Sequence, residues 1–101
     1  MPKPIELHPA AVREAALAFR WYSSRSARAA ERFADALDRA ICQVQERPES
    51  FPLHSAGTKR CLLSRYPYLV VFRELDDRVQ VIAVAHGGAD RGTGNGGSDS
   101  L

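Results

Sequence analysis

Basic side chains and one histidine are the residues of this sequence that could do chemistry on an anionic group. Lys59, Arg60 and Arg65 lie close together in the chain, Arg73 follows in the next apolar run, and His86 comes after the last one. Guanidinium and ammonium groups bind phosphate or carboxylate, and histidine can act as a general acid or base. The pattern predicts a nucleic-acid or target-binding surface at the four cations, with His86 and Arg65 as the candidate catalytic residues.

A purely structural interpretation accounts for the same residues. Strand arginines are often solvated, Arg65 can pair with a helix carboxylate, and a histidine at a strand end can hydrogen-bond a neighbouring loop. Both interpretations stay open at this stage. Cys42 and Cys61 lack metal-ligand spacing and read as small core residues, and Asp76-Asp77 is typical of a turn. We therefore expect neither a metal nor a cofactor.

The composition is that of one small globular domain. The chain has 101 residues, of which 45% are hydrophobic and 26% charged, enough apolar residues for a single core. Its net charge of +2 permits acidic partners without requiring them. The start, Met1-Pro2-Lys3-Pro4, has no apolar signal segment, and no apolar run approaches the ~20 residues of a membrane span. We expect a cytoplasmic protein without a membrane partner.

Two amphipathic helices are predicted in the first half of the chain. Residues 10–23 place Val12, Ala16, Phe19 and Tyr22 at spacings of three and four, which predicts that this face and the neighbouring Trp21 pack in the core. Residues 27–47 show the same periodicity over five turns, and Pro48 ends the pattern. The short link between them predicts an antiparallel hairpin of helices.

The second half of the chain changes to the period of two that is typical of strands. Strands are predicted at residues 60–64, 67–74 and 79–85, after a short one at 5–7. The expected fold class is therefore α+β, a two-helix hairpin on a small, mostly antiparallel sheet in the order β-α-α-β-β-β. Both faces of the strand at 67–74 are apolar, and the helices can cover only one. We expect the face with Leu69 and Val71 to be exposed for a protein partner.

Two segments divide the chain. Residues 1–86 form the predicted domain, and residues 87–101 hold most of the glycines, which predicts a flexible tail.

Several motifs together resemble a known family. The run SRYPYLVVF at residues 64–72 resembles the R-F-P-Y-x-V-x-Y run of RelE/ParE-type toxins, the plasmid-stabilisation proteins of bacterial toxin–antitoxin systems. Residues 79–86 are similar to the family's last strand, which commonly ends in Ala-Val-x-His. The resemblance covers residues 5–86. It implies the fold given above and a cognate antitoxin as partner, with Leu69 and Val71 in its docking surface.

The resemblance extends to two branches with different targets. RelE-like members cleave mRNA on the ribosome, whereas ParE-like members poison DNA gyrase and have no known hydrolytic centre. This chain has Leu69 where RelE-like nucleases carry an arginine after the aromatic residue of the middle strand, and Gly87-Gly88 where they carry a basic residue. The resemblance thus favours a ParE-like toxin that arrests growth through gyrase and is not an enzyme.

Two alternatives stay open beside gyrase inhibition. Lys59 and Arg60 match the basic pair that precedes the sheet in the nucleases, and with Arg65 and His86 they would support a ribosome-dependent mRNA endonuclease. Many ParE-like chains also continue past the final histidine with basic residues and a Pro-x-Tyr-Trp-like segment, which is replaced here by a glycine-rich sequence. The second alternative is therefore a non-toxic remnant that only binds antitoxin.

Overall fold

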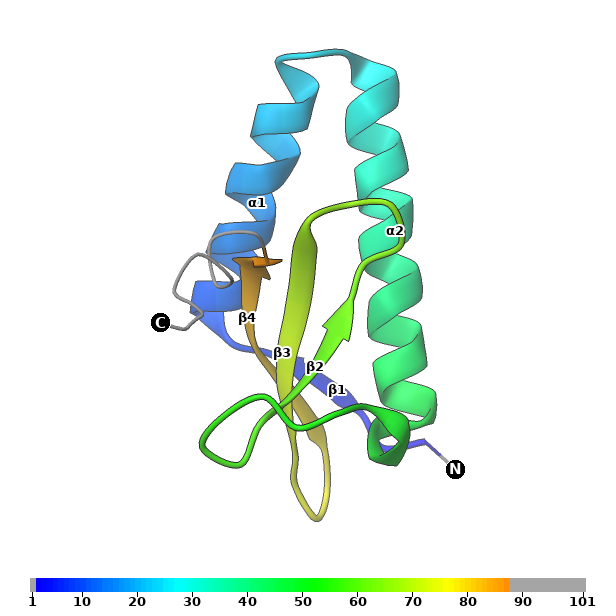
Figure 1. Ribbon diagram of the computed structural model, residues 1–101, viewed down its shortest axis with the longest axis vertical. Helices are drawn as coiled ribbons and strands as arrows, with labels where there is room; N and C mark the ends of the chain where they lie inside the picture. Colours follow the sequence, from blue (N-terminus) through cyan, green and yellow to red (C-terminus); the bar gives the residue numbers. More distant parts are fainter. Residues whose placement is uncertain (1, 88–101) are drawn as a thin grey trace.

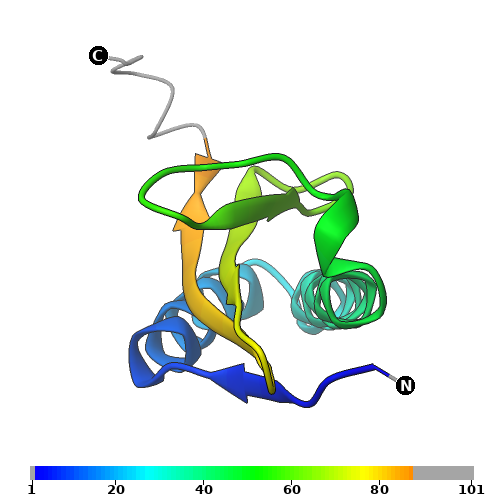
Figure 2. The same ribbon diagram turned by 90° about the horizontal axis from the view of Figure 1, so that it is seen from below.

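A computed structural model describes residues 2–87, which form a four-stranded sheet with two helices on one face (Figures 1 and 2). In chain order the elements are β1 (Ile5–Leu7), α1 (Pro9–Ser23), α2 (Ala27–Glu46), the 3-10 turn η1 (Pro48–Ser50), β2 (Lys59–Leu62), β3 (Tyr68–Glu74) and β4 (Val79–His86). The strand order is β1-β4-β3-β2, in which β1 pairs parallel to β4 and the other pairs are antiparallel. The predicted α+β class and element order are confirmed.

Local signals set the ends of the helices. The His8 side chain caps α1 by accepting from the Ala10 amide at 3.0 Å, and Pro9 follows at a position where its missing N–H costs nothing. The Ser26 hydroxyl caps α2 by accepting from the Ala29 amide at 2.9 Å. Pro48 stops α2 as predicted, and the chain turns into η1. The sequence had assigned no role to His8.

A bulge in β4 decides which of its side chains face the helices. Val71 pairs with Ala83, whereas Phe72 pairs with Val81, so Ile82 is an extra residue on β4. Under strict alternation Val81 and Val84, which are three residues apart, would point to opposite faces of the sheet. Because of the extra residue, Val79, Val81 and Val84 are all buried in the core that the helices cover. The bulge thereby also brings the end of β4 toward α1.

The core face of α1 differs from the predicted one. Ala11 and Ala18 are buried, whereas Val12 and Phe19 are 50% and 42% exposed. The predicted face was wrong except for Tyr22, which stacks on Phe33 at a ring distance of 5.0 Å. Small alanine side chains let the helix axis come close to β4, which the larger residues would prevent.

Three further expectations about exposure were wrong. Trp21 is 51% exposed instead of lying in the core, and Cys42 is exposed, whereas Cys61 is buried as predicted. Leu69 and Val71 are only 7% and 8% exposed, so the sheet face that was expected to be open is largely covered. Segment 51–58 runs on this side of the sheet, opposite the helices (Figure 2).

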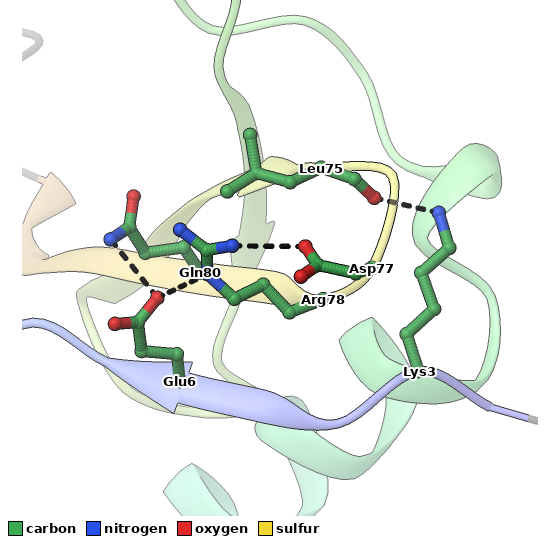
Figure 3. A network of polar contacts seen from close by, with 6 residues as sticks. All are labelled: Lys3, Glu6, Leu75, Asp77, Arg78 and Gln80. Carbon is green, nitrogen blue, oxygen red and sulfur yellow. Dashed lines mark hydrogen bonds and ion pairs between the residues drawn. The ribbon is translucent and has the colours of Figure 1, made fainter.

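Polar contacts fasten the short strand β1 to the β3–β4 hairpin (Figure 3). Glu6 accepts from Arg78 Nε at 2.6 Å and from Gln80 Nε2 at 3.2 Å. Arg78 also pairs with Asp77 at 2.9 Å, and Lys3 Nζ donates to the Leu75 carbonyl at 2.7 Å. The hydrogen bond to Glu6, followed by that to Asp77, raises the pKa of Arg78. Asp77 therefore serves the turn, in agreement with the sequence-based interpretation.

The described residues carry neither a membrane-spanning helix nor a metal-binding group of side chains. No helix among residues 2–87 combines the length and hydropathy needed to cross a membrane. Nor do His, Cys, Asp or Glu side chains gather there in threes around a common point. Apart from Gly87, the predicted tail lies outside the described residues, and the domain boundary at residue 86 stays a prediction.

Candidate functional site

An apolar groove opens between α1 and the strand ends at one edge of the sheet. It has a volume of about 700 Å³. Leu17 and Trp21, one helical turn apart, form one wall, and both are more than half exposed. The remaining lining residues are Glu14, Ala18, Tyr22, Pro67, Tyr68, Val84, Ala85 and His86.

The groove depends on the way α1 replaces β1 along the edge of β4. Strand β1 pairs only with Val79–Val81, so the rest of that edge has no strand partner. Glu14 occupies the next position, where its carboxylate accepts from the Val84 amide at 2.8 Å. A side chain of α1 thus supplies a hydrogen-bond acceptor to the edge of the bulged strand and links the two walls of the groove.

Aromatic contacts hold the floor and rim of the groove. The rings of Tyr68 and His86 meet edge to face at 5.1 Å, and Trp21 meets Tyr22 in the same way at 4.9 Å. The guanidinium of Arg25 lies 4.5 Å from the centre of the Trp21 ring, a cation–π contact that restrains the exposed indole. Burial, and next the neighbouring Tyr68, raises the pKa of Tyr22, so its hydroxyl stays protonated.

A second concavity of about 520 Å³ lies between α2 and the turn from β2 to β3. Its lining is mainly polar and basic: Arg32, Asp35, Arg39, Ser64, Arg65 and Tyr66. Arg65 has a φ of 70°, in the left-handed region that is unfavourable for a residue with a side chain. We call the two concavities the apolar groove and the basic cleft.

The cations predicted from the sequence do not form one cluster. Lys59 Nζ donates to the Pro48 carbonyl at 3.2 Å, and Arg60 donates to the Leu53 carbonyl, so both hold the segment between α2 and β2. Arg73 is exposed and pairs with Gln80 near the opposite end of β3 from Tyr68. Arg65 lies beside two arginines of α2, Arg32 and Arg39, which were not among the predicted site residues.

The two candidate catalytic residues open onto different concavities. His86 lines the apolar groove and Arg65 lines the basic cleft, and the two share no lining residue. General acid–base cleavage of a phosphodiester needs such groups around one phosphate. In this arrangement the apolar groove can hold an apolar segment of a partner and the basic cleft an anion. A catalytic role for either residue stays a prediction.

Sequence reasoning missed several of the lining residues. Glu14 was not among the predicted site residues, and its role depends on a bulge that has no clear sequence signal. Arg32 and Arg39 are seven residues apart, a spacing that places both on one helix face and could have been noticed. Asp35 and Arg39 have the spacing of a helical ion pair, but the ion pairs found within residues 2–87 do not include them.

A family model matches this chain, and two solved structures share its fold. The family model described as ParE toxin of type II toxin-antitoxin system, parDE, matches residues 5–91. The fold is similar to a chain from the chromosomal ParDE toxin–antitoxin system of P. aeruginosa, with a TM-score of 0.63 and 16% identity over 83% of this chain and 95% of that one. It is also similar to a chain of the toxin–antitoxin complex RelBE2 of Mycobacterium tuberculosis, with a TM-score of 0.56 and 20% identity over 85% and 99% of the two chains.

A search of curated proteins found no match. At these low identities the solved structures show a shared fold, whereas the family model spans most of the sequence. The chain therefore belongs to the ParE toxins of type II toxin–antitoxin systems.

Proposed function

We propose that this toxin arrests growth by blocking DNA gyrase and that a cognate antitoxin neutralises it. The observation that carries the choice of gyrase is the match of residues 5–91 to the ParE family, combined with the separation of His86 from Arg65. A toxin that acts by binding needs no assembled acid–base centre. It needs a stable fold and exposed surfaces, and the described residues have both.

The geometry argues against the mRNA endonuclease. Four basic residues could take the place of the arginines and lysines of the RelE-like nucleases. Lys59 and Arg60 donate to backbone carbonyls in the segment between α2 and β2, and Arg73 lies at the end of β3 away from Tyr68. Leu69, at the position of the nuclease arginine, is buried. One phosphodiester could not contact these groups together, and transition-state stabilisation depends on such convergence.

The apolar groove is the docking surface that we propose for the antitoxin. Trp21 and Leu17 are 51% and 55% exposed, and covering a large apolar side chain contributes roughly 1.5–3 kcal/mol when the burial is complete. Leu69 and Val71, the antitoxin contacts predicted from the sequence, have little exposed area left to bury. The groove takes their place because its exposed residues line a concave wall that a helix or strand of the partner can enter.

Growth and supercoiling assays test the proposal together. The full chain is induced alone and with the reading frame beside it, and survivors are counted. Plasmid supercoiling and primer extension on translated mRNA are measured on the same cultures. We expect arrest, loss of negative supercoiling, intact mRNA and rescue by the neighbouring gene.

A variant at one of the candidate catalytic positions sharpens the comparison. Under gyrase inhibition, His86→Ala keeps the arrest, whereas an endonuclease that uses His86 loses it. If mRNA is cut while supercoiling stays normal, the target is mRNA on the ribosome and not gyrase. A soluble chain that binds the neighbour's product without any arrest would show a non-toxic remnant.

A further inference from the structure

The basic cleft lies on the other helix from the apolar groove. Figure 1 shows the connection from β2 to β3 passing beside α2, and the cleft is the space between them. Arg32 and Arg39 come from α2, and Arg65 comes from the connection. None of these residues is used by the apolar groove or by the contacts that hold the sheet together.

The charges of the cleft are unbalanced. Three arginines face a single acid, Asp35, and the ion pairs found among residues 2–87 include none of these four side chains. All four are exposed, so their charges are available to a ligand. Arg28 extends the same side of α2 by one more turn. With a rise of about 1.5 Å per residue, Arg28 to Arg39 form a basic stripe of roughly 16 Å.

The backbone holds Arg65 in an unfavourable conformation. A φ of 70° costs an L-residue free energy, and such a position persists only where the surrounding structure enforces it. The enforcing contacts come from the next residue, Tyr66, whose ring lies 5.3 Å from that of Tyr22 and 5.6 Å from that of Phe33. The Leu63 amide also closes the connection by donating to the Tyr68 carbonyl at 2.9 Å. The backbone at Arg65 is therefore held in place by the core, and its exposed side chain extends from a fixed point.

We propose that the basic cleft binds the phosphodiester backbone of a nucleic acid. Arginine forks bind phosphate oxygens in pairs, and the basic stripe is long enough to follow about four phosphates of one strand, at about 3.4 Å of axis each. A protein ligand would need apolar area to bury, but Tyr66 is the single aromatic residue of a lining that is otherwise charged or polar. A polyanion fits this surface better than an acidic peptide does.

This activity goes beyond gyrase inhibition and does not require it. The assay measures fluorescence anisotropy of a labelled random-sequence DNA duplex with the full chain, made by cell-free synthesis, over a series of salt concentrations. For three or four phosphate contacts, the logarithm of the binding constant should fall against the logarithm of salt concentration with a slope near −3. Each of Arg32→Gln, Arg39→Gln and Arg65→Gln should weaken binding and reduce the slope by about 1.

Two further variants separate binding from folding and from net charge. Arg65→Gly removes the guanidinium and the backbone strain together, so it should lose affinity while melting no lower than the parent chain. Arg13→Gln changes the net charge by the same amount as each cleft variant, but at an exposed position of α1 outside the cleft. It should leave the slope nearly unchanged. Equal losses in Arg13→Gln and in the cleft variants would overturn the proposal.

Competing ligands identify the source of the phosphates. A single-stranded RNA of the same length is titrated beside the duplex, and tighter binding of either one supports a phosphodiester ligand and names its source. Polyglutamate that binds more tightly than both nucleic acids would overturn the proposal in favour of an acidic peptide. Because no gyrase is present, a negative result leaves the gyrase proposal standing, and a failure of gyrase inhibition leaves this one standing.

Discussion

Removal of the Glu14 carboxylate should destabilise the whole domain, although Glu14 lies on a helix and no strand residue changes. Its carboxylate accepts from the Val84 amide at 2.8 Å, just beyond the bulge in β4. A hydrogen bond to a charged group contributes about 1.5–3 kcal/mol when well buried. Glu14 is half-buried, so water can replace part of that bond. We therefore expect Glu14→Ala to lower the free energy of unfolding by about 1–2 kcal/mol.

Urea denaturation followed by far-ultraviolet circular dichroism measures this loss. For a domain of this size, 1 kcal/mol corresponds to a change of about 4–8 °C in melting temperature. The slope of free energy against urea should stay constant, since the same surface is exposed on unfolding. Alanine is a slightly better helix former than glutamate, which offsets the loss by a few tenths of a kcal/mol.

Two matched variants decide whether the bond to Val84 is the cause. Glu14→Gln keeps an oxygen that can accept from the Val84 amide. It should therefore lose less than half of the stability that Glu14→Ala loses. Glu31→Ala removes an exposed carboxylate from α2 and should change stability by less than about 0.5 kcal/mol. If Glu14→Ala and Glu31→Ala behave alike, Glu14 does not hold β4 against α1, and the account of the groove wall is wrong.

Four other predictions follow from exposure, burial and backbone geometry. Trp21→Ala should weaken antitoxin binding in calorimetry about 10- to 30-fold, whereas Val12→Ala, on an exposed part of α1 outside the groove, should weaken it less than threefold. Arg65→Gly should raise the free energy of unfolding by about 0.5–1 kcal/mol, because glycine tolerates the positive φ at some entropic cost; a loss of stability in urea would contradict the strain. A thiol reagent should modify Cys42 at once and Cys61 only on unfolding. Burial raises the pKa of Cys61 above its ordinary value of 9.0, so the unfolded chain ionises first, and stability that is present below that pH is lost above it. If a Cys61→Ala variant loses the same stability at high pH, the loss comes from the ionisation of another group.

The second helix shows what a sequence pattern can predict well. Its apolar residues lie on one narrow face, Ser26 caps one end, and Pro48 stops the other, so periodicity and end signals agree. In α1 the apolar residues are spread around most of the helix, and periodicity fits more than one face. The alanine side faces the sheet because it permits close packing on β4, and this preference depends on a strand about 70 residues away.

The candidate site was less predictable than the fold because it depends on contacts between distant segments. A single extra residue at Ile82 changes the face of the sheet to which the side chains at the end of β4 point, and the run of five apolar residues at 81–85 gives no sign of where such an insertion falls. Arg65 could be recognised as a candidate from the sequence. The spacing of Arg32 and Arg39 shows that they share a helix face, but not that they lie beside Arg65, because only the folded chain brings the turn before β3 beside α2.

The two concavities meet at one short segment of the chain. Ser64, Arg65 and Tyr66 line the basic cleft, and Pro67 and Tyr68 line the apolar groove. No residue belongs to both, so an apolar partner in the groove leaves the arginines of the cleft uncovered at their own surface. If the proposals hold, an antitoxin-bound toxin should still contact nucleic acid through the cleft, and Arg65→Gln should weaken nucleic-acid binding by the toxin–antitoxin complex as well as by the free chain. The antitoxin would then neutralise the toxin by covering the apolar groove, and the arginines of the basic cleft would still bind nucleic acid.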